Sequence, residues 1–123
     1  MENKKEDIKI SIADFTKSGK PVADAGQIAS RIYRSLKEDK EVNISYVFTH
    51  NSASSDKLVL KAEKADRILG RMLKENNDRD RTKDRIVRSL PESEKVNSSD
   101  IDPETGKNKK LLVIKVTYYL IKG

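Results

Sequence analysis

Apolar residues alternate with polar ones near the start of the chain and recur at helical spacing soon afterwards. Ile8, Ile10 and Ile12 alternate with polar residues, a period of two that is typical of a strand with one buried face. The polar residues 1–7 are expected to be frayed. After Pro21, apolar residues recur every three or four positions, which predicts the apolar face of a helix. These residues are Val22, Ala25, Ala29, Ile32, Tyr33 and Leu36.

A second strand and a second helix follow in the same order. Val42, Ile44, Tyr46 and Phe48 alternate with polar residues and are of types that strands favour. Residues 49–56 are rich in turn and N-cap types. The strongest helical stripe of the chain comes next and consists of Leu58, Ala62, Ala65, Leu69 and Met72. The other face of this helix is basic, with Lys57, Lys61, Lys64, Arg67, Arg71 and Lys74.

The charged residues from 76 to 90 have a weaker pattern. The asparagines at 76 and 77 predict the end of the second helix. We predict a further short helix that includes Ile86, Val87 and Leu90, because charged residues at 80 and 84, and at 81 and 85, have helical spacing. A strand over residues 79–90 is the alternative, and Pro91 ends either element.

The last third of the chain predicts a β-hairpin. Its turn "DPETGK" begins with Asp-Pro and contains Gly106, which can adopt the positive φ of a bulged hairpin. A short strand from Val96 to Ile101 would precede it, and "LLVIKVTYYLIKG" would form the last strand. One face of that strand would carry Leu112, Ile114, Val116, Tyr118 and Leu120. We therefore predict an α+β two-layer sandwich, with two main helices on one face of a four-stranded mixed sheet, as a single domain over residues 8–123.

The charge of the chain suggests what it binds. The 123 residues have a formal net charge of +6 and an isoelectric point near 9.5, so a polyanion such as nucleic acid is the expected partner. The alternative is a domain that is basic without such a partner. No apolar run approaches the length of a membrane span, so we expect a soluble, cytoplasmic protein with no membrane partner.

Composition excludes several kinds of chemistry. The chain has no cysteine, which rules out disulfides and thiolate metal sites. His50 is the only histidine, so a site built on two histidines is excluded, and a turn or capping role is expected for it. No nucleophile motif is visible. We expect no metal, no cofactor, no small-molecule substrate and no enzymatic activity.

A Gly-Lys pair precedes the first helix. A phosphate-binding loop needs a second glycine, separated from the first by four residues, and a Ser or Thr after the lysine. Here Pro21 follows Lys20 and removes a backbone N–H that an anion would bind, so this is not a nucleotide loop. Lys17 and Lys20 still precede a helix N-terminus, where an anion is favoured. The alternative is a turn that simply exposes two lysines.

Two further basic sets are candidates for phosphate contacts. The predicted hairpin arm carries Lys107, Lys109 and Lys110, which either neutralise phosphates or protect a strand edge from aggregation. The segment after the second helix carries Arg79, Arg81, Arg85 and Arg88, and arginine binds phosphate with two parallel hydrogen bonds. On the second helix itself the lysines are mixed with Glu63 and Asp66, a pattern typical of a solvated face.

The order of these motifs resembles the Alba-like family, whose fold stage V sporulation protein S shares. The resemblance lies in a strand followed by "SGKPVADAGQIASRIYRSL", and in the closing "KNKKLLVIKVTYYLIKG". It implies a βαβαββ domain, often a homodimer, that binds DNA or RNA through the lysine loop and the hairpin arm. Lys20 matches the loop lysine and Lys17 lies near it. Lys107, Lys109 and Lys110 match the basic arm by their position in the hairpin.

The chain also departs from the family pattern. It has "THNSASSDK" where the family has a Gly-Arg turn, a charged insertion at about residues 76–95, and an acidic stretch at 92–104 beside the arm. The sequence therefore predicts a protein that contacts the phosphate backbone of DNA or RNA with little sequence selectivity. A non-enzymatic protein-interaction or regulatory module on the same scaffold is the alternative.

Overall fold

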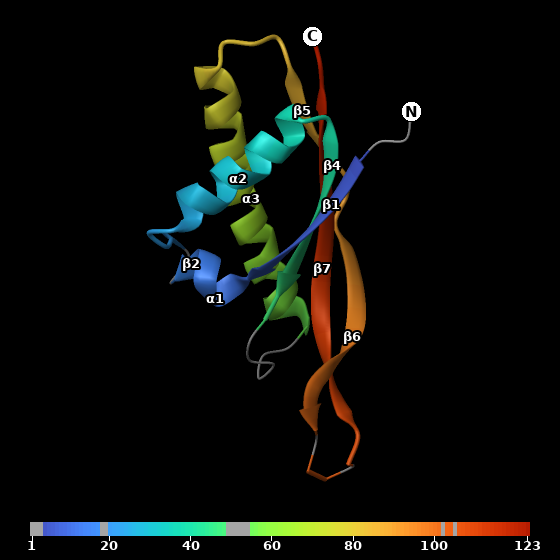
Figure 1. The fold of residues 1–123 in the computed structure, drawn as a ribbon. Coiled ribbons are helices and arrows are strands. Elements are labelled where there is room, and N and C mark those ends of the chain that lie inside the picture. The colour runs from blue at the N-terminus through green and yellow to red at the C-terminus, as the bar shows by residue number, and fades with distance from the viewer. Residues whose placement is uncertain (1–3, 18–19, 49–54, 102, 105) are drawn as a thin grey trace.

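Two long helices lie on one face of a mixed β-sheet (Figure 1). The computed structural model describes residues 4–17, 20–48, 55–101, 103–104 and 106–123. Its elements are β1 (Lys4–Ser11), α1 (Ile12–Phe15), β2 (Thr16–Lys17), β3 (Lys20–Pro21), α2 (Ala25–Lys37), β4 (Lys40–Val47), α3 (Ser55–Arg79), β5 (Arg85–Arg88), β6 (Glu92–Ile101) and β7 (Asn108–Ile121). The α+β class and the two helices on one face agree with the prediction from the sequence.

The sheet is organised around β7, its longest strand. β1 pairs in parallel with β4, and β4 pairs antiparallel with one edge of β7. The other edge of β7 pairs antiparallel with β5 near its C-terminal end and with β6 along the rest. The sheet therefore has five strands where the sequence predicted four, in the order β1-β4-β7-β5, with β6 also paired to β7. β2 and β3 form a separate two-stranded ladder.

The core lies between the sheet and the helices, at the positions that the periodicity predicts. Alternate residues of β4 and β7 are buried, as is the apolar stripe of α3. Removing this apolar surface from water is the main force that holds the two layers together. The buried residues include Val42, Ile44, Tyr46, Ala62, Ala65, Leu69, Leu73, Ile114, Val116 and Tyr118, with Met72 and Leu120 partly buried against them.

The helix predicted within residues 79–90 is wrong, because Arg85–Arg88 forms the strand β5. Arg81 has φ of 52°, a left-handed conformation that a continuing α-helix does not allow. Beyond it, Ile86 and Val87 pair with Leu120 and Tyr119 of β7. The free edge of β7 thus supplies hydrogen-bonding partners that local spacing does not reveal.

The end of α3 was predicted at Asn76 and Asn77, and this too is wrong, because the helix continues to Arg79. The Asn76 amide donates a hydrogen bond to the carbonyl oxygen of Met72, at 3.0 Å. The Asn77 amide donates to the carbonyl oxygen of Asp84 beyond the helix, at 2.8 Å. Asn77 therefore fastens the loop after α3 to the helix.

The N-terminal part differs from the prediction in two ways. Residues 4–7, which were expected to be frayed, belong to β1 and pair with residues 40–43 of β4. Ile12, which the alternation placed in the first strand, instead begins the short helix α1. Phe15, at the end of α1, is fully buried although no periodic pattern marks it.

The C-terminal hairpin is longer than predicted, since β6 begins at Glu92. Its distal part extends beyond the rest of the sheet (Figure 1). Gly106 has φ of 68°, which confirms the predicted positive φ in the turn. Of the turn and capping candidates at residues 49–56, those at 49–54, including His50, lie outside the described residues. Ser55 and Asp56 belong to the first turn of α3. Among the described helices, none has the length and apolar character needed to cross a membrane.

Candidate nucleic-acid interface

Lys17 and Lys20, here called the lysine pair, lie directly opposite each other. β2 and β3 form a two-residue antiparallel ladder in which Lys17 faces Lys20 and Thr16 faces Pro21. Both lysines are exposed, and in the described part of the chain no carboxylate forms an ion pair with either. Like charges opposite each other destabilise a strand pair. The lysine pair is thus a local excess of positive charge.

The lysine pair is attached to the core on both sides. The Val22 amide donates a hydrogen bond to the carbonyl oxygen of Phe15, at 2.9 Å, which closes the segment that carries both lysines. The first turn of α2 follows directly and contains no acidic residue, so its amides add positive potential nearby. Asp24 at the N-cap offsets part of that potential. The sequence therefore placed these two lysines correctly relative to α2.

The hairpin arm forms a separate basic region. Lys107 is exposed beside Gly106, whereas the side chains of Lys109 and Lys110, on β7, lie outside the described part. Figure 1 shows the end of the hairpin well away from β2 and β3. Within one copy of the chain, the arm and the lysine pair therefore do not form one compact site. At the base of the arm, Glu94 pairs with Lys115.

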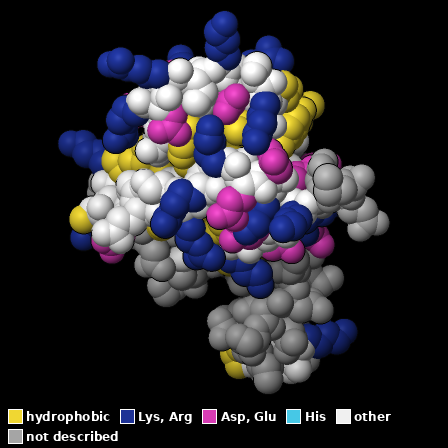
Figure 2. Space-filling view, turned by 45° about the horizontal axis from the view of Figure 1, so that its top comes forward, with side chains coloured by type: hydrophobic (Ala, Val, Ile, Leu, Met, Phe, Trp, Pro, Cys, Tyr) yellow, Lys and Arg dark blue, Asp and Glu magenta, His cyan; other side chains and the backbone are white. Residues whose placement is uncertain are grey.

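Three of the four predicted arginines are dispersed around the end of α3 and over β5. Arg79, at the end of α3, is exposed and lines a shallow groove between α2 and α3 together with Arg34. Arg81 is exposed in the loop after α3, and Arg85 lines a different groove between α3 and β5. Figure 2 shows one face of the molecule on which Lys and Arg side chains predominate with Asp and Glu scattered among them. Neither of these grooves is lined by Lys17 or Lys20.

Asp66 is a residue whose role sequence reasoning missed. It was assigned to the solvated face of the second helix, but it is only 3% exposed. Its carboxylate accepts hydrogen bonds from the hydroxyls of Tyr46, at 2.5 Å, and Tyr118, at 2.6 Å, and from the guanidinium of Arg88. Burial is the main cause that raises the pKa of both tyrosine hydroxyls well above its usual value. Arg88 is thereby committed to the fold rather than available for phosphate.

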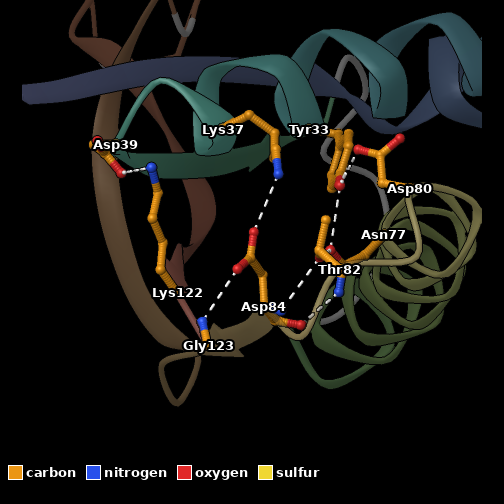
Figure 3. Close-up of polar contacts among 9 residues, drawn as sticks. All are labelled: Tyr33, Lys37, Asp39, Asn77, Asp80, Thr82, Asp84, Lys122 and Gly123. Carbon is orange, nitrogen blue, oxygen red and sulfur yellow. Dashed lines mark hydrogen bonds and ion pairs between the residues drawn. The ribbon is translucent and has the colours of Figure 1, made fainter.

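A second polar cluster fastens the C-terminal ends of both helices to the end of the chain (Figure 3). The Asp84 carboxylate accepts hydrogen bonds from the Lys37 ammonium and from the Gly123 amide, each at 3.1 Å. The Tyr33 hydroxyl donates to Asp80, at 2.6 Å. Because Asp84 is held on both sides, it fixes the position of the loop between α3 and β5.

The contacts that Asp84 makes with Lys37 and Gly123 are here called the Asp84 clamp. We predict that this clamp weakens in acid. The hydrogen bond from the Gly123 amide, followed by that from Lys37, lowers the pKa of Asp84 below its usual value. The contribution of the ionised Asp84 carboxylate to folding stability is complete above the unfolded pKa of about 3.9. It is lost as pH falls through the lower pKa of the folded state. Asp84→Asn should therefore lower the melting temperature at neutral pH, and the difference from the parent should shrink below about pH 4. Thermal unfolding followed by circular dichroism measures this.

The control for this prediction is Asp78→Asn. Asp78 is exposed, and its side chain forms no described ion pair or hydrogen bond. This variant should melt within experimental error of the parent at every pH. A constant difference between Asp84→Asn and the parent from neutral pH to about pH 2 would contradict the proposed clamp.

The site and the fold define an α+β protein with an exposed basic segment beside its first long helix. Among the described residues, no group of three His, Cys, Asp or Glu side chains is arranged to hold a metal ion. No protein-family model and no curated protein matches the chain.

Proposed function

We propose that this protein binds the phosphate backbone of DNA or RNA with little sequence selectivity, and that the lysine pair is the primary contact. The observation that carries the proposal is the register of Lys17 opposite Lys20 in the β2–β3 ladder. Side chains opposite each other in such a ladder have Cβ atoms about 5 Å apart, so both ammonium groups can reach one phosphate or two neighbouring ones. A bound phosphate would offset their mutual repulsion.

The arrangement of the larger elements also supports the proposal. With the short elements α1, β2 and β3 set aside, the order is β1, α2, β4, α3, β5, β6 and β7, which has one strand, β5, more than the βαβαββ order of an Alba-like domain. The lysine pair lies between the first main strand and the first main helix, where the resemblance implies the nucleic-acid contact. The hairpin arm would supply a second, separate contact through Lys107, Lys109 and Lys110. A homodimer would double the number of such contacts.

Binding to nucleic acid at a series of salt concentrations tests this function. Backbone binding releases counterions, so the logarithm of the affinity should fall linearly with the logarithm of salt concentration. Two to five contacts with duplex DNA predict a slope of about −2 to −4.5. Fluorescence anisotropy with labelled duplex DNA and single-stranded RNA, from about 50 to 200 mM salt, measures the slope. The absence of binding to both at the lowest salt would overturn the proposal.

A second candidate function has one specific observation in its favour. Tyr119 and Ile121 are each 41% exposed and point to the face of β7 opposite the core, because Tyr118 and Leu120 face the helices. Val87 pairs with Tyr119 on the neighbouring strand β5. Such an apolar group on an uncovered sheet face suits a protein-interaction module. A folded chain that binds no nucleic acid at low salt would favour this second function.

A further inference from the structure

A groove with a volume of about 660 Å³ lies between α3 and β5. Its size falls in the range of small-molecule sites in proteins. α3 contributes Arg67, Gly70 and Lys74 to its lining, β5 contributes Arg85 and Arg88, and Tyr118 of β7 lies at its base. Among the described side chains, neither the lysine pair nor Lys107 of the hairpin arm lines this groove. It is therefore separate from the nucleic-acid contact proposed above.

Gly70 leaves the centre of this groove open. It lies inside the 25-residue helix α3, where a glycine is less favourable than an alanine. A Cβ atom at this position would meet only the Tyr118 hydroxyl, at 3.7 Å, which is an ordinary contact. Packing within the protein therefore does not require glycine here. A glycine does allow close approach of a ligand to the helix backbone.

The groove is basic around this glycine. Arg67 and Lys74 are three residues before and four residues after Gly70, so they lie on the same face of α3. Both are exposed, and the sequence from 67 to 74, "RILGRMLK", contains no acidic residue. Arg85 approaches from β5 on the other side, whereas the charge of Arg88 is already paired with Asp66. A ligand beside Gly70 would thus have cations on both walls of the groove.

The carboxylates of the groove do not cancel this charge at its centre. Asp66 is neutralised by Arg88, and Asp84 by Lys37. The other two, Glu63 and Asp78, lie about one helical turn beyond Arg67 and Lys74, towards the ends of the groove. The central part between them consequently favours an anion.

We propose that the α3–β5 groove binds a phosphate group, held against Gly70 by Arg67, Lys74 and Arg85. Arginine is suited to this role because its planar guanidinium donates two parallel hydrogen bonds to phosphate oxygens. The phosphate could belong to a free nucleotide or to a nucleic-acid strand, and both offer the same charged oxygens. The proposal does not depend on the lysine pair.

An NMR titration of the full chain tests the groove. The two ligands are adenosine monophosphate and a ten-nucleotide single-stranded RNA. We expect saturable shifts of the backbone amides around Gly70, and a dissociation constant at least about tenfold higher for the double variant Arg67→Glu with Lys74→Glu. Gly70→Leu should weaken binding to a similar extent by filling the floor of the groove, while it favours the helix.

Matched controls exist on α2 and α3. Gly26→Leu makes the same substitution at an exposed glycine of α2 with open space around it, and Lys57→Glu with Lys64→Glu makes the same charge change at exposed positions of α3 outside the groove. Both should retain the parent affinity for adenosine monophosphate, as should Lys17→Glu with Lys20→Glu. The affinity of the groove variants for adenosine monophosphate tests the groove, whereas the affinity of the lysine-pair variant for DNA and RNA tests the lysine pair. Failure of one site is therefore distinguishable from failure of the other.

The outcomes assign the ligand or overturn the proposal. Saturable binding of the mononucleotide that the groove variants abolish assigns a nucleotide site. Binding of the RNA alone, weakened by the same variants, assigns a strand contact. If neither ligand shifts the amides around Gly70, or if both groove variants bind as tightly as the parent, the groove is not a phosphate site.

Discussion

Replacing Asp66 with alanine should lower the free energy of unfolding by about 2–6 kcal/mol, because two buried tyrosine hydroxyls would lose their acceptor at a cost of about 1–3 kcal/mol each. Asp66 is buried and accepts hydrogen bonds from Tyr46, Tyr118 and Arg88. Without it, two tyrosine hydroxyls would remain in the core with no acceptor, and the Arg88 guanidinium would lose its counterion. Because small domains are stable by about 5–15 kcal/mol, this single change could unfold much of the protein at physiological temperature.

Urea denaturation of the parent, Asp66→Ala and Asp66→Asn measures the effect. The asparagine variant retains one acceptor oxygen but loses the charge that neutralises Arg88, so its stability should lie between the other two. Asp78→Ala is the surface control on the same helix, and it should change stability by less than about 0.5 kcal/mol. A loss below about 1 kcal/mol for Asp66→Ala would show that the hydroxyls and Arg88 find other partners.

The parts of the fold that the sequence predicts are those where burial imposes a regular period. α2, β4, the apolar stripe of α3 and the long strand β7 each bury one face, and their alternation or helical spacing is visible without any knowledge of their neighbours. The turn at Gly106 was also predictable, because few residue types other than glycine adopt its positive φ readily.

The parts that were not predicted depend on partners far away in the sequence. β5 has only four residues, and its strand conformation follows from pairing with residues 118–121 of β7. The burial of Asp66 likewise follows from Tyr118, which is distant in sequence and whose hydroxyl needs an acceptor. One local signal existed, since Asp66 is four residues after Ala62 and three before Leu69, both on the buried stripe.

The candidate site also has one part that the sequence predicts and another that it does not. Lys17 and Lys20 are three residues apart, so their proximity follows from the sequence, whereas their opposition follows from the β2–β3 ladder. The hairpin arm lies far from this ladder, and the arginines are divided between two grooves. Both facts depend on how the helices pack on the sheet, which local sequence does not reveal. Residue type alone therefore identified candidate cations but not which of them act together.

Reversing both charges of the lysine pair should weaken backbone binding by about 10- to 100-fold at low salt and make the salt slope for duplex DNA shallower by about 2. The double variant Lys17→Glu with Lys20→Glu replaces one like-charged pair with another, so its stability should remain within about 0.5 kcal/mol of the parent. Lys4→Glu with Lys9→Glu is the control, since it makes the same change in net charge at exposed positions of β1.

The single variant Lys17→Glu separates binding from folding. It places a carboxylate opposite Lys20 in the β2–β3 ladder, which should stabilise the ladder by about 0.2–1 kcal/mol. The same carboxylate would repel a phosphate, so affinity should fall while the melting temperature stays level or rises. A fall in affinity together with a level or higher melting temperature is expected if the two lysines repel each other in the free protein and contact the polyanion in the complex. If the single and double variants bind DNA and RNA as tightly as the β1 control, the lysine pair is not part of the interface.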